Sequence, residues 1–411
     1  MSRRPDVRSM VGTELDLDIG PVAHGGHWVA RHEGRVVFVR HALTGERVRA
    51  IVTDGHDGSG FWRADAIEVL VAAPERVAPP CPWAGPDRCG GCDFQHVDVA
   101  AQRALKATVV REQLEHLGGL DLAALGIDVQ VEDVPGDDGG LGWRTRVQYA
   151  VAADGRAGLR RHRSHQVVSI DRCRIAHPLV QIQDVLDRTW PGVTSVVVAA
   201  SPGTGEVAVL ADGRPTPDTP AMPAVLTETV GDLRYQVAAG GFWQVHPGAA
   251  PTLLAAVLAA LDPQVGEKAM DLYGGVGLFA VALAERVGPS GRVTLVEADG
   301  EGITQARANL AAFPTARIER GRVDHVLRRA HHQRADVVVL DPPRAGAGKA
   351  VVDLVARLHA RRIVYVACDP AALARDLRRF AEKGYRLTGL RAFDLFPMTA
   401  HVECVAVLDP R

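Results

Sequence analysis

A regular alternation of two kinds of segment in the second half of the chain constrains the fold most strongly. From Val265 onward, short apolar runs alternate with segments of helical spacing. The apolar runs cover residues 268–272, 292–297, 336–340, 362–367 and 402–408. Parallel strands need helical crossovers between them, and this alternation therefore predicts a doubly wound α/β sheet. Ligands bind at the carboxyl ends of such strands, so the residues that follow each run are the first candidates for a site.

The beginning of the chain follows a different pattern, with short strand-like runs separated by turns. Residues 36–39 and 47–52 have strand-like composition, and glycines mark turns at 25–26 and 57–60. Short strands joined by regular turns predict a small, OB-like β-barrel. The proline-rich stretch at 74–82 then predicts a linker out of this barrel.

The length of 411 residues is too great for one typical core, and two or three domains are expected. Residues 98–118 have helical spacing, and this helix is a candidate to pack on the last domain. A mixed α+β region follows, and the four prolines at 211–223 predict a loop or linker. We place the domains at residues 8–73, 74–235 and 236–411.

The charge balance excludes attraction of the whole molecule to nucleic acid. The formal net charge is -2, so any nucleic-acid surface has to be a local patch. With 47% apolar and 23% charged residues, the composition is that of ordinary globular domains. No apolar run approaches the roughly 18 residues of a membrane span, and no apolar signal region follows the arginines of the first ten residues. We expect a cytoplasmic monomer that does not use a membrane.

A glycine-rich turn follows the first strand of the predicted sheet. In the stretch 271–279, glycines allow a ligand to approach the backbone closely, and the next helix presents its N-terminus. Glu297 closes the second strand, where a carboxylate can accept hydrogen bonds from both hydroxyls of a ribose. A dinucleotide is the competing ligand, and a purely structural turn is the other alternative. The acidic Asp271 and the lack of strict dinucleotide spacing favour S-adenosylmethionine.

Two further strands end in residues that can carry chemistry. Residues 341–344 read Asp-Pro-Pro-Arg, and residues 368–370 read Cys-Asp-Pro. A helix begins after Cys368, and we expect its N-terminal dipole to lower the pKa of the thiol and so to favour a nucleophile. The alternative is an ordinary buried cysteine. Glu403, in the segment 396–403, is a candidate general base; taken alone, its position favours a solvated carboxylate on a strand.

Taken together, these motifs resemble the class I RNA 5-methyluridine methyltransferases, the family of tRNA and 23S rRNA uracil-C5 methyltransferases. The matching pieces, in the family's order, are residues 242–245, 271–273, 296–297, 341–344, 365–370 and 396–403. The resemblance covers nearly the whole chain, because the N-terminal barrel is similar to a TRAM domain. It implies a C-terminal, Rossmann-like class I methyltransferase domain that acts on RNA.

The resemblance also implies roles for individual residues. It implies Cys368 as the nucleophile and Glu403 as the base. Contacts to S-adenosylmethionine are implied for Gln244, Tyr273, Gly275, Gly277, Glu297 and Asp341. Three positions depart from the family's usual pattern: His246 stands in place of asparagine, Gly274 in place of cysteine, and Asp369 in place of the asparagine after the nucleophile. We expect Asp369 to turn its oxygens toward the backbone N–H groups of the following helix.

The chemistry of uracil explains why a cysteine and a base are needed. C5 of uracil is a poor nucleophile, and a thiolate that adds to C6 gives C5 the electrons to attack a methyl sulfonium. The C5 proton must then leave, which requires a base. Arg344 could stabilise charge on the pyrimidine oxygen or form a simple salt bridge. We therefore predict methyl transfer to C5 of a uridine in structured RNA, either tRNA or 23S rRNA; the alternative is an RNA-binding protein that keeps the fold with weakened catalysis.

Four cysteines stand apart from the catalytic motifs. Cys81, Cys89, Cys92 and Cys173 can together hold a [4Fe–4S] cluster or a zinc ion, and their spacing alone fits either. The resemblance favours the cluster, because a subset of the family carries these four cysteines. We expect a structural or RNA-recognition role for the group. Cys404 is expected to be part of the core of the last strand.

A concentration of arginines predicts a surface for RNA. Eight arginines lie between Gly142 and Arg174, with aromatic and histidine side chains between them. The interleaved residues are Trp143, Tyr149, His162 and His165. Phosphate contacts combined with aromatic stacking suit folded RNA. The alternative is a solvated charged face.

Overall fold

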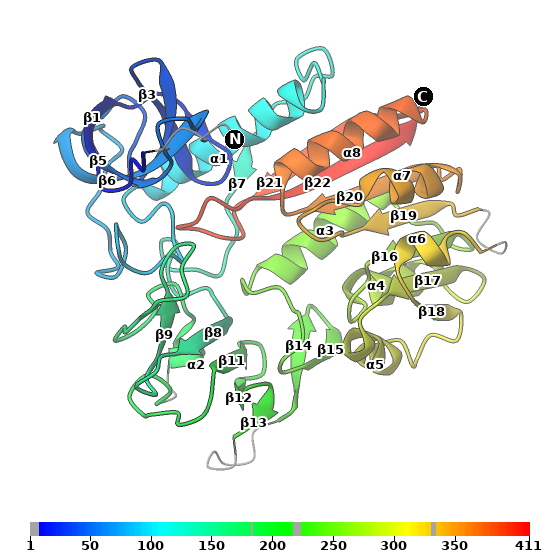
Figure 1. The fold of residues 1–411 in the computed structure, drawn as a ribbon. Helices are drawn as coiled ribbons and strands as arrows, with labels where there is room; N and C mark the ends of the chain where they lie inside the picture. Colours follow the sequence, from blue (N-terminus) through cyan, green and yellow to red (C-terminus); the bar gives the residue numbers. More distant parts are fainter. Residues whose placement is uncertain (1–7, 182–183, 217–222, 330–333) are drawn as a thin grey trace, which may run out of the picture.

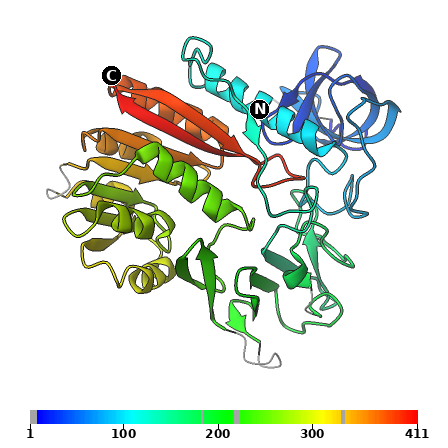
Figure 2. The same ribbon diagram turned by 180° about the vertical axis from the view of Figure 1, so that it is seen from behind.

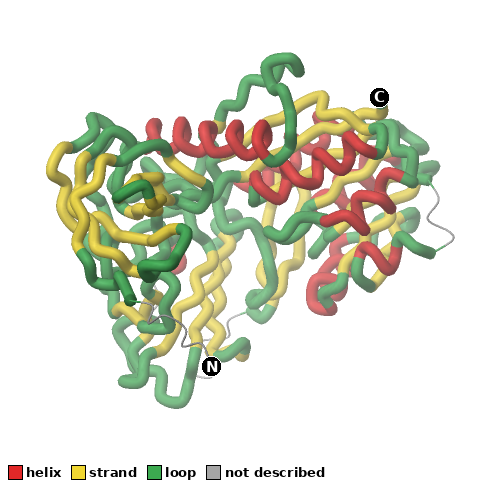
Figure 3. Tube along the Cα trace, turned by 45° about the horizontal axis from the view of Figure 1, so that its top comes forward, coloured by secondary structure: helices red, strands yellow, loops and turns green. Residues whose placement is uncertain are grey.

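The computed structural model describes residues 8–181, 184–216, 223–329 and 334–411. The chain forms three regions that lie side by side (Figures 1 and 3). The N-terminal and central regions consist mainly of strands and loops, and the C-terminal region contains most of the helices. Of the linker predicted at 211–223, residues 217–222 lie outside the described ranges. No helix in the described part of the chain combines the length and hydropathy that a membrane span needs.

The N-terminal region is a six-stranded sheet in the order β1-β5-β6-β4-β3-β2, which curls around its own core (Figure 1). Alternate residues of these strands are buried, as β1 and β5 show, and Trp28 and Val37 are among the residues that fill the core. The two strands predicted from composition are confirmed within β4 and β5. The strands are β1 (Glu14–Asp18), β2 (Val22–Ala23), β3 (His27–His32), β4 (Arg35–Arg40), β5 (Arg47–Asp54) and β6 (Phe61–Val71).

The central region joins a long helix to a second six-stranded sheet. The predicted helix is present as α1 (Val99–His116), and Asp98 caps it by accepting hydrogen bonds from two backbone N–H groups. The sheet has the order β10-β9-β8-β11-β12-β13, and β14 and β15 form a separate hairpin. The elements are β8 (Arg146–Val151), β9 (Ala157–Arg160), β10 (Val167–Val168), α2 (Pro178–Gln181), β11 (Ser195–Ser201), β12 (Glu206–Ala211), β13 (Arg214–Pro215), β14 (Val225–Val230) and β15 (Leu233–Ala238).

The C-terminal region contains the predicted α/β sheet, in the order β18-β17-β16-β19-β20-β22-β21-β7. The first five of these strands are parallel, and β22 runs antiparallel to both of its neighbours. The strands are β7 (Val131–Glu132), β16 (Lys268–Leu272), β17 (Arg292–Glu297), β18 (Ala316–Arg320), β19 (Val337–Leu340), β20 (Arg362–Ala367), β21 (Tyr385–Phe393) and β22 (Glu403–Pro410). All five predicted runs are therefore strands, and β7, β18 and β21 are additions.

Helices cover both faces of this sheet (Figure 2). Successive residues of β19 and β20 point into two different cores: Val339 and Val364 pack with α3 and α4, whereas Val338 and Ile363 pack with α1, α7 and α8. This division explains why the strands read as continuous apolar runs. The helices are α3 (Ala249–Leu261), α4 (Leu278–Val287), α5 (Gly300–Asn309), α6 (Val323–Val326), α7 (Gly348–Ala356) and α8 (Pro370–Glu382).

Helix α1 is tied to the C-terminal region by a buried ion pair. The Lys106 Nζ atom lies 2.5 Å from Oδ1 of Asp394, just after β21, and both side chains are only 1% exposed. The same ammonium group donates to the Phe396 carbonyl at 3.0 Å, and Oε1 of Gln102 accepts a hydrogen bond from the backbone N–H of Met398. Two side chains of α1 therefore fix the loop that leads into β22.

We expect Lys106→Ala to lower the free energy of unfolding by about 3–5 kcal/mol, because it leaves the Asp394 carboxylate buried without its partner. Urea denaturation measures this loss. Arg103→Ala is the matched control, since Arg103 lies one turn earlier on α1 and pairs with the exposed Asp133; it should cost about 1 kcal/mol or less. Equal, small losses in both variants would contradict a structural role for the buried pair.

Candidate active site

A cavity of about 1060 Å³ lies at the carboxyl ends of β16, β17, β19 and β20. Its walls bring together residues that are far apart in the sequence. The predicted site residues that line it are Gln244, Tyr273, Gly275, Glu297, Asp341, Arg344, Cys368 and Glu403. Gly277 is not among the described residues of the wall; it is instead the N-cap of α4, with a left-handed backbone. The rule that strand ends share one crevice therefore places the sequence motifs correctly.

The glycine turn after β16 is held in an unusual backbone conformation by its neighbours. Tyr273, Gly275 and Gly277 have positive φ angles of 64°, 53° and 96°. The N–H of Gly275 donates to Glu297 Oε2 at 2.9 Å, and the other oxygen of Glu297 accepts from two backbone N–H groups at the end of β17. The carboxylate at the second strand end is thus oriented by the same loops that form the wall.

Below the turn, a buried carboxylate and a close contact shape the loop. Asp271 is fully buried and accepts the N–H of Ala280 at 2.9 Å, and burial raises its pKa to about 7. It supports the start of α4 from within the protein. At Gly274, a Cβ atom would lie 2.6 Å from Leu295 Cγ, so only glycine fits. A cysteine at position 274 would therefore require Leu295 to move.

Two carboxyl groups face the sulfur of Cys368. Glu403 is only 4% exposed, which excludes the solvated carboxylate considered from the sequence. Burial and the charge of Asp341 raise the pKa of Glu403 well above its usual range, and burial raises that of Asp341 to about 7. Both groups therefore hold a proton more readily than an ordinary carboxyl group does.

The expected lowering of the Cys368 pKa is wrong for this structure. Burial, and then the carboxylates of Glu403 and Asp341, raise the thiol pKa to about 12, whereas Arg344 opposes them. The helix N-terminus lies next to the residue, but its field is outweighed by desolvation and by two negative charges from other strands. Cys368 is nevertheless half-buried and lines the cavity, unlike the core cysteine Cys404, which is fully buried in β22 as expected.

Asp369 takes the role that was expected of it. Its Oδ1 atom accepts the N–H of Ala372 at 2.7 Å and so caps α8. Its other oxygen lies 3.0 Å from Nε2 of His24, a residue of the N-terminal sheet. Sequence reasoning missed His24, because no local motif connects it with residues so distant in the chain.

Two more histidines near the site have distinct surroundings. The Nε2 atom of His401 lies 3.3 Å from Nη2 of Arg344, and burial together with this guanidinium lowers the His401 pKa to about 4. His246 is buried, accepts the N–H of Gly248 through Nδ1, and stacks on Trp143. The departure from asparagine at His246 is thus accommodated by a structural role.

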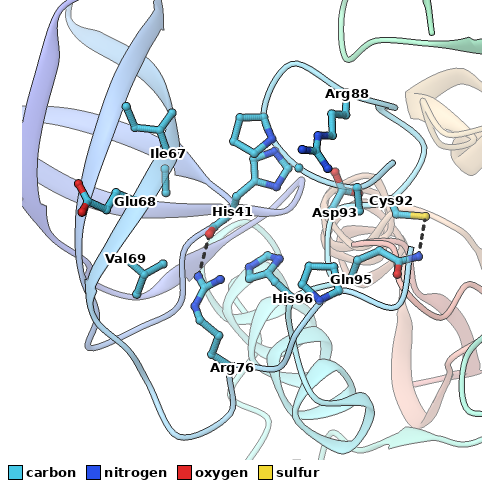
Figure 4. A pocket seen from close by; sticks show the side chains of 15 residues that line it. His41, Ile67, Glu68, Val69, Arg76, Arg88, Cys92, Asp93, Gln95 and His96 are labelled. Atoms are coloured by element: carbon cyan, nitrogen blue, oxygen red, sulfur yellow. Dashed lines mark hydrogen bonds between the residues drawn. The ribbon is translucent and has the colours of Figure 1, made fainter. Parts of the chain in front are cut away.

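The four cysteines of the N-terminal and central regions line one small cavity. In the part of the chain that the structure describes, no group of three or more histidine, cysteine or acidic side chains meets the geometry needed to hold a metal ion. Two sulfurs accept hydrogen bonds: Cys89 Sγ from the N–H of Gly91 at 3.4 Å, and Cys92 Sγ from Gln95 at 3.5 Å. Figure 4 shows the second bond at the border of a neighbouring cavity beneath the N-terminal sheet.

The arginine-rich segment proves to be only partly a surface. Arg146 is buried against Glu228, with Nη2 and Oε1 at 3.0 Å. Trp143 and Tyr149 are 2% exposed, so their predicted role in stacking on RNA bases is wrong. Tyr149 lies on the inner face of β8, and Trp143 lies in the segment just before that strand. The many charged residues around them in the sequence did not indicate that these two side chains are buried.

The later part of the arginine-rich segment lies against the N-terminal sheet. Arg161, His162 and Arg163 line a cavity of about 440 Å³ together with two arginines of that sheet, Arg40 and Arg63. Arg161 is paired with Asp87. Burial and the neighbouring arginines lower the pKa of His162 to about 4. Asp54, Asp65 and Asp87 also line this cavity, so its lining is of mixed charge, with arginines more numerous than carboxylates.

Comparisons with known proteins agree with this architecture. Residues 225–411 match the family described as tRNA (Uracil-5-)-methyltransferase, and residues 8–64 match the TRAM domain. An uncharacterised RNA methyltransferase of Streptomyces coelicolor is 50% identical over 98% of this chain and 94% of its own length. A second one, of Bifidobacterium longum, is 36% identical over 99% and 98%.

A solved structure supports the fold. The crystal structure of Pyrococcus abyssi tRNA (uracil-54, C5)-methyltransferase in complex with S-adenosyl-L-homocysteine is similar with a TM-score of 0.69, covering 95% of this chain and 99% of that chain at 23% identity. The fold is thus that of a methyltransferase joined to a TRAM domain. This chain belongs to the RNA uracil-5-methyltransferase family.

We expect alkylation of Cys368 by iodoacetamide to be slow at pH 7–8 and to rise without a plateau up to pH 10, because the thiol pKa is about 12. Mass spectrometry of the peptide that contains Cys368 measures the rate. Glu403→Gln removes one of the two carboxylates that raise this pKa, and its alkylation should be faster at pH 9–10. A plateau below pH 8 in the unmodified protein would show that the thiol is instead acidic.

Proposed function

We propose that Cys368 adds to C6 of a uridine in structured RNA and that Glu403 removes the C5 proton after methyl transfer. The observation that carries this proposal is the meeting of Cys368, Glu403 and the glycine turn in one cavity. When bound, S-adenosylmethionine supplies the methyl group that C5 attacks, and it leaves as S-adenosylhomocysteine. Loss of the C5 proton to Glu403 then restores the C5–C6 double bond as the Cys368–C6 bond breaks.

The residues of the cavity wall suit S-adenosylmethionine. Glu297 at the end of β17 would accept hydrogen bonds from the ribose, and Gln244, Tyr273 and Gly275 would surround the rest of the molecule. Burial raises the pKa of both Asp341 and Glu403, and the charge of Asp341 raises that of Glu403 further. A sulfonium cation would relieve this repulsion, and a positive charge at that place suits the wall better than a neutral ligand.

The same charges explain how a thiol with a raised pKa can act. Cys368 has to lose its proton before it can add to C6, and burial, followed by the carboxylates of Glu403 and Asp341, favours the protonated thiol. A cation in the cavity would offset these two charges and lower the pKa of Cys368. Arg344 acts in the same direction. We propose that the nucleophile becomes reactive only once the cavity is loaded.

The four cysteines are proposed to hold a [4Fe–4S] cluster. Cys81, Cys89, Cys92 and Cys173 line one cavity, and hydrogen bonds from N–H groups to two of the sulfurs are typical of thiolates in iron–sulfur centres. When bound, the cluster would join the segment 81–92 to Cys173. It would thereby stabilise the contact between these two parts of the chain. Zinc is the alternative ion for four thiolates.

RNA is proposed to reach the cavity across the exposed parts of Arg63, Arg161 and Arg163. Phe242 lies at the wall of the active-site cavity with 73% of its surface exposed, which offers an aromatic face to an unstacked base. We propose tRNA or 23S rRNA as the substrate and the cytoplasm as the place of action.

The reaction is tested with RNA that carries [5-³H]uridine. Cys368→Ala should release no tritium and still bind S-adenosylmethionine in equilibrium dialysis, because the thiol makes the covalent bond and does not hold the cofactor. Glu403→Gln should slow turnover by about 10²–10⁴-fold and accumulate a protein–RNA adduct that survives denaturing gels. Cys404→Ala is the matched control and should turn over normally.

Full turnover by Cys368→Ala would refute the covalent route. Tight RNA binding by the unmodified protein without any tritium release would favour the alternative of an RNA-binding protein with lost catalysis.

We expect anaerobically purified protein to contain about four iron and four sulfide per chain, with absorbance near 400 nm. Cys173→Ala should lose the iron, because it removes one of four ligands. Cys404→Ala should keep it, since Cys404 lies in β22 away from the cysteine cavity. One zinc per chain with no iron would overturn the assignment.

A further inference from the structure

One turn of the N-terminal sheet reaches both catalytic segments. The residues between β2 and β3 are His24, Gly25 and Gly26. The Nε2 atom of His24 lies 3.0 Å from Oδ2 of Asp369, the residue after the nucleophile. A Cβ atom at Gly26 would lie 2.9 Å from Cβ of Ala400, in the segment that leads to Glu403. The turn thus touches the nucleophile's loop on one side and the base's segment on the other.

The contact at Gly26 leaves no space for a side chain larger than hydrogen. Its backbone has a φ of 75°, which favours glycine, and a side chain there would also meet Asp93 at 3.0 Å. Asp93 in turn accepts the N–H of Ala400 at 3.2 Å and lies 3.5 Å from Arg40 of β4. The N-terminal sheet is therefore seated against the segment 396–403 by close packing as well as by hydrogen bonds.

The two oxygens of Asp369 have separate partners. Oδ1 accepts the N–H of Ala372 in the first turn of α8, and Oδ2 faces His24. The carboxylate next to Cys368 in the chain is thus bonded on both sides. The pKa of Asp369 is lowered because the His24 and Ala372 hydrogen bonds outweigh burial, which agrees with a carboxylate that stays charged.

We propose that His24 is a positioning residue for the nucleophile: it holds Asp369, and through it the backbone of Cys368, only while the N-terminal sheet is docked on the catalytic region. This inference rests on the proposed role of Cys368. Asp369 stands where the family usually has asparagine. An asparagine could still cap α8 through its carbonyl oxygen, but it would turn an NH2 group toward His24 and lose the charge-assisted bond. The histidine and the aspartate therefore suit each other.

The proposal is tested by a double-variant cycle with His24→Ala and Asp369→Asn. Under saturating RNA and S-adenosylmethionine, each single variant should slow the single-turnover rate of adduct formation by about tenfold, with the Kd for RNA little changed. The double variant should also be about tenfold slower, and not a hundredfold, because both changes remove one interaction. His24→Gln, which can still donate a hydrogen bond to Asp369, should recover most of the rate.

A second measurement does not depend on the reaction. Hydrogen exchange of the amides at the start of α8 should be faster in His24→Ala than in the unmodified protein, because Asp369 is less firmly held. His32→Ala is the control for the N-terminal sheet, since His32 lies at the opposite end of β3 from the turn; it should change neither the exchange nor the rate.

Three results would overturn the positioning role. These are additive effects in the double variant, a weaker Kd for RNA with an unchanged saturated rate, and unchanged exchange at α8 in a folded His24→Ala protein. Failure of the proposed function itself looks different, because the unmodified protein would then form no adduct whatever residue stands at position 24.

Discussion

The buried contact between Lys106 and Asp394 is the interaction on which the arrangement of the site depends. It joins helix α1 to the loop between β21 and β22 in a place from which water is excluded, where a lone charge would be costly. The same loop continues through Met398 and Ala400, which the central and N-terminal regions hold by hydrogen bonds and packing, and ends at Glu403. The proposed base is therefore placed by side chains from outside its own sheet.

The electrostatics of the cavity follow from a concentration of carboxyl groups that only a cation can balance. The half-buried Asp341 and the buried Glu403 line the cavity, Asp271 lies buried beneath its glycine turn, and all three have a raised pKa. Arg344 is the one guanidinium among the described residues of the cavity wall that opposes the raised pKa of Cys368. Under the proposed mechanism, the empty cavity favours protonated groups and an inert thiol, and a sulfonium ion would reverse both tendencies. Burial raises the pKa of Cys368 as well, so these charges act together with desolvation.

Much of the fold and the site could be predicted from the sequence because the evidence was local. Apolar runs bounded by helices identified five strands of the sheet, and the strand-end rule brought Tyr273, Asp341 and Cys368 into one cavity. What failed depended on neighbours distant in the chain. The Cys368 pKa was misjudged because a helix dipole is visible in the sequence, whereas the approach of Glu403 and Asp341 is not. The burial of Trp143 and the contact of His24 with Asp369 were not predicted, for the same reason.

Strand β7 has a consequence that reaches beyond the site. Its two residues pair in parallel with β21 and close the last edge of the catalytic sheet, although they come from the chain before the central sheet (Figure 1). An uncovered edge of this kind is a template for pairing with another chain. A catalytic half cut from the chain after the central sheet would therefore lose this strand and leave Ala392 and Phe393 without their partners on that side.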